Sequence, residues 1–248
     1  THCISSAASD VYKRQVYNQA LERGVATYVP RLFNKVHTGI DCPVKRAVSP
    51  EVICRLMTDR KPLPGKLAFS RDLFVLLFLL RGMPFVDLAF LRRCDLQGNV
   101  ITYHRRKTSR KLTVVVGKEA MEIIQKYMYA IPDSPYLFPI IQNPGKDEYG
   151  QYARMLRLQN YRLTQVANIL GIRDRLSTYT ARHTWATTAL RQNYNSSLIC
   201  DAMGHSSVKV TETYFQPYRD DEVNRMNSSL ITYILSKKKR GTDKKIRS

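Results

Sequence analysis

The sequence predicts a mainly α-helical fold that carries one small β-hairpin or sheet. Apolar residues recur at helical spacing through much of the chain, whereas two short β-branched segments flank a basic turn. Hydrophobic residues make up 44% of the 248 residues and charged residues 24%, which is typical of globular proteins. We therefore expect one good-sized core, or one core with a fragment of a second domain.

Local start and stop signals predict the first helices. Residues 16–37 have the spacing of one amphipathic helix and its exit, and a linker follows. Ser49 and Pro50 are typical of a helix cap and a first helical residue. Ala68–Arg81 is the most apolar stretch, so we predict a central buried helix there, ended by Gly82.

Two strands and five more helices complete the prediction. Asn99–Tyr103 and Leu112–Val116 are predicted strands, joined by the basic turn His104–Lys111. The further helices are predicted over Lys118–Tyr129, Asp147–Leu170, Thr180–Arg191, Ser196–Met203 and Asp221–Leu235. Residues 1–15 are predicted to be non-native or disordered, and the basic tail 237–248 to be disordered.

The charge of the chain predicts a polyanionic partner. There are 40 Lys and Arg against 20 Asp and Glu, which gives a net charge of +20. Such a surface attracts phosphates, so nucleic acid is the first expectation. A ribosome-associated protein and a membrane-surface binder are the alternatives. The longest apolar run, Leu73–Leu80, has the length of a core helix and is too short to span a membrane.

The five cysteines do not predict a metal site. None of them forms a CxxC pair, and no Cys and His cluster has zinc-finger spacing. We expect reduced, mostly buried thiols, as in a cytosolic chain.

Four residues in separate motifs carry the functional prediction. They are Lys107 in the basic turn, Arg182 in TYTARHTWA, His205 in MGHSS and Tyr214 in TETYF. Each alone is a weak signal, because a given tyrosine is most often a packing residue and a given lysine a solvated charge. Their order and the nine-residue step from His205 to Tyr214 make the combination specific.

These motifs resemble the ending of the tyrosine recombinase (phage integrase) family, Arg-His-Thr-x-Ala, then Leu-Gly-His, then Tyr nine residues later. The resemblance is closest to integrases of Bacteroides-type mobile elements. Those share Arg-Gly-Met-x-Phe-Val-Asp at Arg81–Asp87, Tyr-x-x-Arg-Lys-Thr at Tyr103–Thr108, and Thr-x-Tyr-x-Ala-Arg-His at Ser177–His183. The match spans about 47–218.

The resemblance implies a tyrosine recombinase-like catalytic domain over 47–236. Residues 16–46 would then be the last helix of a truncated core-binding domain with its linker. The implied activity is site-specific DNA recombination, by integration, excision or inversion, through a 3′-phosphotyrosine intermediate. It needs double-stranded DNA but no metal, ATP or other cofactor. The implied location is the bacterial cytoplasm, at the nucleoid. With half of the DNA clamp missing, we expect weak, salt-sensitive DNA binding.

The implied roles agree with the chemistry of each residue type. Tyr214 would attack phosphorus and hold the DNA covalently. Arg182 would donate two parallel hydrogen bonds to phosphate oxygens, and His205 a further one. Lys107 would protonate the 5′-oxygen leaving group.

Two positions depart from the family pattern. The histidine that usually stands three residues before the second arginine is Tyr179, which can still donate to phosphate. The position of the first catalytic arginine is Pro84, which has no donor. Arg81, predicted at the end of the buried helix, is our candidate replacement, with Arg92 and Arg93 as alternatives.

Other residues are predicted to support the site. Asp87 would brace the region around the first arginine, and His183 would support the catalytic groups by hydrogen bonding. The remaining cations of the turn are predicted to bind DNA: Arg105, Arg106, Arg110 and Lys111.

The last helix has an apolar stripe that includes Leu230 and Ile231. It would either pack on its own core or dock on a neighbouring copy and join a homotetramer on DNA. Two other functions stay open at this point. One is a catalytically inactive DNA-binding module of the same fold, and the other is DNA relaxation by a type IB topoisomerase-like enzyme.

Overall fold

The computed structural model describes residues 16–29, 46–59, 61–215 and 220–242, with only the backbone of 222 and 233–242. The chain divides into two units, Thr1–Val44 and Lys45–Ser248. In the first unit a helix covers 16–22, so the predicted helix is shorter than expected, and 30–37 lies outside the described residues. The predictions for 1–15 and 243–248 also fall outside them.

The second unit begins with the two predicted helices. Helix α2, Pro50–Thr58, starts with Pro50 at its first position directly after Ser49. Helix α3, Gly65–Leu79, is buried on nearly all sides, with Leu73, Phe74 and Leu77 all at 0% exposure. The chain leaves α3 at Leu80 and turns through two left-handed residues, Arg81 and Gly82.

Three antiparallel strands form one small sheet in the order β1-β2-β3. Strand β1 is Leu96–Gln97, β2 is Val100–His104 and β3 is Lys111–Val115. Ile101 and Tyr103 are buried, as their alternation along the strand predicted. The hairpin of β2 and β3 is therefore confirmed, whereas β1 is too short to show a sequence pattern.

The other helices follow in chain order. They are α4 (Phe85–Ala89), the 3₁₀ helix η1 (Arg93–Asp95), α5 (Lys118–Tyr127), α6 (Glu148–Leu170), α7 (Thr178–Arg191), α8 (Ser196–Met203), α9 (Val208–Glu212) and α10 (Asp220–Thr242). Helix α8 has the bounds that were predicted. The five-residue helices α4 and α9 were not predicted, because so short a segment shows no helical period.

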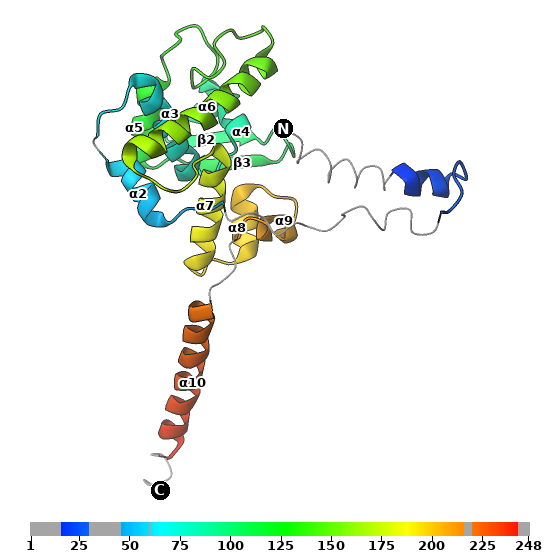
Figure 1. Cartoon of the computed structure of the whole chain (residues 1–248), viewed down its shortest axis with the longest axis vertical. Coiled ribbons are helices and arrows are strands. Elements are labelled where there is room, and N and C mark those ends of the chain that lie inside the picture. Colours follow the sequence, from blue (N-terminus) through cyan, green and yellow to red (C-terminus); the bar gives the residue numbers. More distant parts are fainter. Residues whose placement is uncertain (1–15, 30–45, 60, 216–219, 243–248) are drawn as a thin grey trace. The chain divides into compact units, whose positions relative to one another are not determined.

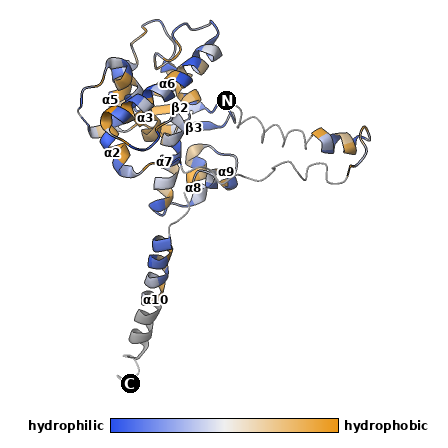
Figure 2. Cartoon of the chain, viewed as in Figure 1, coloured by the Kyte–Doolittle hydropathy of each residue, from blue (hydrophilic) through white to orange (hydrophobic). Residues whose placement is uncertain are grey.

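The main core surrounds α3. Helices α5, α6 and α7 all pack against it, and the sheet lies within the same unit (Figure 1). Helix α3 is strongly apolar, whereas α7 has mostly polar and neutral residues (Figure 2). A smaller cluster joins Ala186 of α7 to Ile199 and Met203 of α8, with Tyr214 and Phe215 packed on it.

Helix α10 extends further than predicted. It continues to Thr242, so residues 237–242 are helical and not the disordered tail that the sequence suggested. Its side chains Val223, Met226, Leu230 and Ile231 are exposed. No helix of the described ranges is long and apolar enough to cross a membrane.

The cysteine prediction is wrong in part. Cys200 is buried, but Cys54 and Cys94 are exposed, and all three are free thiols.

Two glycines allow parts of the chain to approach each other closely. Gly82 has φ 66°, and a Cβ there would lie 3.1 Å from Cα of Arg182 in α7. Gly204 ends α8 with φ 64°, and a Cβ there would lie 2.7 Å from Cδ of Arg105 and 2.8 Å from Cδ1 of Leu112. Only glycine allows both this backbone conformation and this contact between the hairpin and α8.

Replacing Gly204 by alanine is therefore expected to lower the free energy of unfolding by about 2–4 kcal/mol, from left-handed strain and from the clash with the hairpin. Gly98→Ala is the matched control, since Gly98 has φ 60° but no atom within 4 Å of a Cβ. Denaturant unfolding of both variants measures the difference. Equal losses would mean that the contact with Arg105 and Leu112 does not contribute.

Candidate active site

A cavity of about 250 Å³ lies where the hairpin, α7 and the α8–α9 region meet. Polar and charged side chains from three separate segments line it. They are Arg105, Lys107 and Thr108 from the hairpin turn, Tyr179 and Arg182 from α7, and His205, Ser206 and Tyr214 from the segment after α8. The structure thus brings together the four residues of the predicted constellation and Tyr179.

Arg182 is held inside the protein by carbonyl groups. Helix α7 starts at a capping box made by Ser177 and Thr180, which fixes the first turn before Arg182. The Arg182 side chain is buried, with 2% exposure. Its Nη1 donates to the carbonyl oxygen of Gly82 at 2.5 Å, and its Nη2 donates to that of Met203 at 2.9 Å. Its buried Nε has no partner among the described residues.

Arg105 also lies inside, although the sequence suggested a solvated DNA-binding residue. It is 6% exposed. Its Nη1 donates to the carbonyl oxygens of Met203 at 3.1 Å and Gly204 at 2.7 Å, and its Nε lies 3.4 Å from Oδ2 of Asp87. The two buried guanidinium groups therefore meet at one atom, the carbonyl oxygen of Met203.

The wall of the cavity carries an excess of positive charge. Asp87 is the one carboxylate in the described chain that bonds to either arginine, and its Oδ1 also accepts from the backbone N–H of Arg106 at 2.9 Å. Burial raises the pKa of Asp87. Burial, together with the charge of Arg105, lowers the pKa of Arg182. Two buried cations against one carboxylate form a site prepared for an anion.

His205 is neutral and bonded on both ring nitrogens. Its Nε2 accepts from Nη2 of Arg182 at 2.6 Å, and its Nδ1 lies 2.8 Å from Oγ1 of Thr211. Burial, and then the charges of Arg182, Arg105 and Lys107, lower the pKa of His205 to about 3. The prediction that His205 donates to phosphate thus needs a change of protonation, because its Nε2 is an acceptor in this state.

Tyr214 is fixed through its backbone as well as its ring. Its carbonyl oxygen accepts from Nδ1 of His183 at 3.2 Å and from Oγ1 of Thr187 at 3.1 Å. Its ring stacks on that of His205, with centroids 5.0 Å apart. Its hydroxyl lies 3.0 Å from that of Tyr179. His183 thus bonds to the backbone of Tyr214.

Tyr179 is a neutral partner of the Tyr214 hydroxyl. Burial and the hydrogen bond to Tyr214 raise the pKa of Tyr179 to about 12. The Arg46 guanidinium lies over its ring, 5.6 Å from the centroid. A phenol that keeps its proton can donate to a neighbouring phenolate, so Tyr179 can stabilise the charged form of Tyr214.

The remaining cations of the hairpin turn lie in different environments. Lys107 is exposed and lines the mouth of the cavity. Arg106 lies over the Phe90 ring at 3.8 Å, and Arg110 donates to the carbonyl oxygen of His205 and to Asp201, both at 2.9 Å. Lys111 is exposed at the start of β3.

Arg81 does not take the place that the sequence suggested. It lies beyond the end of α3 in the left-handed conformation, because α3 ends at Leu79. Its Nη1 donates to the carbonyl oxygen of Thr113 at 3.2 Å, and it lines a different groove from the cavity of Tyr214. The alternative Arg93 is bonded to the carbonyl oxygens of Ile131 and Pro132. Pro84, in contrast, lines the cavity, and Arg105 supplies the second guanidinium there.

Sequence reasoning missed Thr187 and Thr211 entirely and assigned Arg105 to the surface. The threonines belong to no spacing pattern that distinguishes them from packing residues. A weak signal existed for Arg105, because it follows Tyr103 by two residues and thus points to the same buried face of the strand. In the described ranges no three His, Cys, Asp or Glu side chains come together as metal ligands.

The low pKa of His205 predicts a loss of stability in acid. An unfolded chain takes up a proton at His205 near pH 6.5, whereas the folded chain does so only near pH 3. The free energy of unfolding should therefore fall as the pH is lowered from about 6.5 towards 3. Urea unfolding at several pH values, compared with His205→Gln, isolates this contribution. His183, whose pKa burial also lowers, adds to the slope in both proteins. Identical slopes would contradict the prediction.

Comparison with known proteins identifies a family match. Residues 47–220 match the Phage integrase family. The tyrosine recombinase XerC of Thermodesulfovibrio yellowstonii is 26% identical over 167 residues, which cover 62% of this chain and 52% of the relative. The chain thus spans about half the length of that protein.

Solved structures share the fold at low sequence identity. The Tn1549 transposon integrase in complex with a circular intermediate DNA is 16% identical, with a TM-score of 0.59 over 86% of this chain and 75% of that one. A lambda integrase dimer bound to a COC′ core site is 13% identical, with a TM-score of 0.56 over 85% and 74%. Since the family match extends over well more than half of the sequence, the chain belongs to the phage integrase family.

Proposed function

We propose that this chain is the catalytic part of a site-specific DNA recombinase that cuts and rejoins DNA through Tyr214. The observation that carries the proposal is the pair of buried arginines, Arg105 and Arg182, of which only Arg105 bonds to a carboxylate, that of Asp87. An unpaired buried charge is costly unless a ligand of opposite charge completes the site. A phosphodiester supplies that charge, and two guanidinium groups suit its oxygens.

The positive site favours attack on phosphorus. Fixed cations stabilise the negative charge that develops on the equatorial oxygens of the transition state. Tyr214 would form the new bond to phosphorus while the bond to the 5′-oxygen breaks. The neutral imidazole of His205, stacked on the Tyr214 ring, is the proposed acceptor of the phenolic proton. Lys107, at the mouth of the cavity, would give a proton to the 5′-oxygen.

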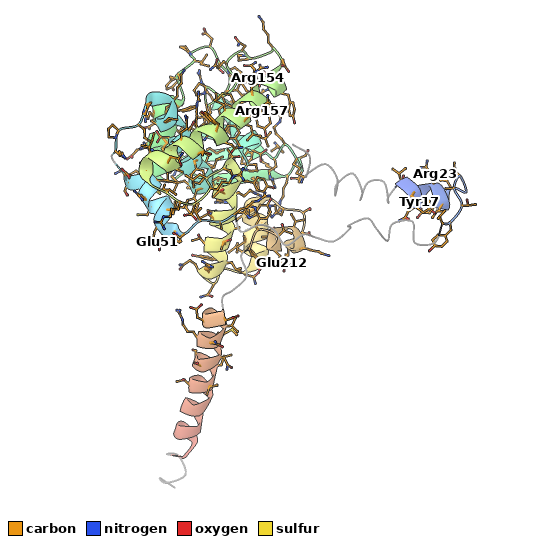
Figure 3. All side chains as sticks on the ribbon, in the orientation of Figure 1. Tyr17, Arg23, Glu51, Arg154, Arg157 and Glu212 are labelled. Atoms are coloured by element: carbon orange, nitrogen blue, oxygen red, sulfur yellow. The ribbon has the colours of Figure 1, made fainter. Side chains whose placement is uncertain are left out.

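The surface supports double-stranded DNA as the partner. Lys107, Arg106 and Lys111 are exposed around the hairpin, and Arg154 and Arg157 are exposed on α6 (Figure 3). Phosphate contacts of this kind orient a protein on DNA without selecting a sequence. The proposal includes integration, excision or inversion of mobile DNA, and a bacterial cytoplasmic, nucleoid-associated location. The motifs at Arg81–Asp87 and Ser177–His183 support an integrase of the Bacteroides type.

Helix α10 is proposed to join copies of the chain on DNA. An apolar groove of about 660 Å³ lies between α7 and α8 and includes Trp185, Leu198 and Ile199. Exposed apolar side chains on α10, among them Leu230 and Ile231, match it in chemistry. The lambda integrase relative is a dimer on its core site. Because Ile199 and Trp185 also contact the cluster that holds Tyr214, a helix in this groove would act on the nucleophile.

A catalytically inactive DNA-binding module is the second candidate. The observation that favours it is the proline at position 84. The buried Arg105 argues against it, because this residue places in the cavity the guanidinium that Pro84 cannot supply.

Covalent trapping on a nicked duplex that carries a candidate attachment site tests the activity, without metal or ATP. The wild-type chain should give a protein–DNA adduct on a denaturing gel, and Tyr214→Phe none. Arg105→Ala should slow adduct formation by about 10²–10³-fold, as for loss of one donor to the transition state. Arg81→Ala, the matched control, should have little effect. No adduct with the wild-type chain would favour the inactive module, and loss with Arg81→Ala alone would restore Arg81 as the replacement.

Substitutions that add a carboxylate to α10 test its role in joining copies of the chain on DNA. Leu230→Asp should prevent assembly of higher complexes on DNA while leaving single-site binding intact, because it places a carboxylate on the apolar face. Ser228→Asp adds the same charge on the polar side of the same helix, away from Leu230, and serves as the control. Sedimentation of the protein–DNA complexes distinguishes the two. Assemblies of equal size with both variants would exclude α10 as the contact.

A further inference from the structure

The basic turn of the hairpin is bonded at both of its ends to one short segment of backbone. Arg105, the first residue after β2, donates through its side chain to the carbonyl oxygens of Met203 and Gly204. Arg110, the last residue before β3, donates through Nη1 to the carbonyl oxygen of His205 at 2.9 Å. Three consecutive carbonyl groups after and at the end of α8 thus accept from the two ends of the turn.

The turn between these ends has a defined shape. The backbone N–H of Arg105 donates to the carbonyl oxygen of Arg110 at 2.9 Å, and that of Ser109 donates to the carbonyl oxygen of Arg105 at 2.8 Å. Ser109 has φ 54°, a left-handed conformation that is costly for a residue with a Cβ and persists where its surroundings impose it. The contacts of the turn are therefore needed to keep its shape.

Lys107 lies in this turn, between two anchored residues. On one side, the backbone N–H of Arg106 donates to Oδ1 of Asp87 at 2.9 Å. On the other side, Nη2 of Arg110 donates to Oδ1 of Asp201 in α8 at 2.9 Å, in addition to the carbonyl bond of its Nη1. Arg110 thus joins the turn to the end of α8 by two bonds.

The turn in this shape places Lys107 at the cavity. Its side chain lines the same cavity as Arg182 and His205, whereas that of Arg110 does not. Burial, and then the charges of Arg182, Arg105 and Lys107, lower the pKa of His205 to about 3, so the charge of Lys107 acts on the site from this position. Arg110 can therefore influence the chemical step only through residues that do line the cavity.

We propose that Arg110 is a positioning residue that holds the hairpin turn against α8, so that Lys107 stays at the cavity and can protonate the 5′-oxygen. The inference rests on the proposed function and assigns what prepares its acid. It gives Arg110 a role inside the protein, instead of the DNA contact that the sequence predicted. The two bonds to the carbonyl oxygen of His205 and to Asp201 are the interactions that perform this role.

The proton from Lys107 completes the cleavage. As the phenolic oxygen of Tyr214 bonds to phosphorus, the electron pair of the broken bond stays on the 5′-oxygen. That oxygen takes a proton from the Lys107 ammonium and leaves as a hydroxyl, and the lysine becomes a neutral amine. A sulfur atom in place of the bridging 5′-oxygen leaves as a thiolate, which is stable without a proton because thiols are far more acidic than alcohols. Such a substrate therefore needs no proton from Lys107.

Adduct formation on nicked duplexes that carry either the 5′-oxygen or a bridging 5′-sulfur tests the role of Arg110. Arg110→Gln should slow the reaction of the oxygen substrate by about tenfold or more, a part of the roughly 10²–10⁴-fold that a general acid contributes. The sulfur substrate should restore the rate of Arg110→Gln, as it should that of Lys107→Ala. Equal slowing of Arg110→Gln on both substrates would overturn the proposal, because the defect would then not lie in protonation of the leaving group.

Arg106→Gln is the matched control, because it removes the same charge from the same turn and leaves the backbone bond to Asp87 in place. A lost phosphate contact should slow both substrates by the same factor, so the ratio of the two rates should keep its wild-type value in Arg106→Gln. The wild-type ratio in Arg110→Gln as well would mean that Arg110 contributes only its charge, against the proposal.

Hydrogen exchange of the chain without DNA gives a second readout that does not depend on activity. Arg110→Gln should speed exchange of the backbone N–H of Ser109 by about tenfold, because the turn then opens without global unfolding. Exchange at Phe74, buried in α3, should not change. Unchanged exchange at Ser109 would refute the positioning role. If the wild type forms no adduct with either substrate, the proposed function fails, whereas the exchange rates still decide whether Arg110 holds the turn.

Discussion

The carbonyl oxygen of Met203 is the point on which the site depends. It accepts from Arg105 of the hairpin and from Arg182 of α7, so one backbone atom joins three segments that are distant in sequence. The last residue of α8 offers this carbonyl because helix ends leave such groups without intrahelical partners. The left-handed Gly204 then allows the hairpin to approach. Two positive charges are thereby buried side by side with one carboxylate, Asp87, so an anion would balance the second charge.

Tyr214, the proposed nucleophile, is held by neutral groups. His183 and Thr187 hold the carbonyl oxygen of Tyr214, and Tyr179 bonds to its hydroxyl. None of these groups adds charge, so the positive field of the arginines acts on the phenol undiminished. The guanidinium of Arg182 and Nε2 of His205 also bond to each other. A substrate must therefore exchange hydrogen bonds and not merely fill a space, which is a source of selectivity for phosphate.

The sequence predicted the helices and the hairpin well because their signals are local. Apolar spacing gave α3 and α6, and the bounds of α8 were correct, whereas α4 and α9 were too short to show any period. At the site, the motifs identified Lys107, Arg182, His205 and Tyr214 as a group, and the structure gathers all four at one cavity. Arg81, the predicted replacement for the first arginine, lies just after α3 and lines another groove, where it bonds to the carbonyl oxygen of Thr113.

By itself, the sequence determined the longer helices, the hairpin, the excess of positive charge and the group formed by Lys107, Arg182, His205 and Tyr214. These depend on residue type and on spacing along the chain. Only the tertiary structure decided which arginine lies beside Arg182, which nitrogen of His205 is an acceptor, and which threonines bond to the His205 ring and to Tyr214. Those properties arise from contacts between segments up to about a hundred residues apart, such as Arg182 with Gly82, and from the burial that changes their pKa values.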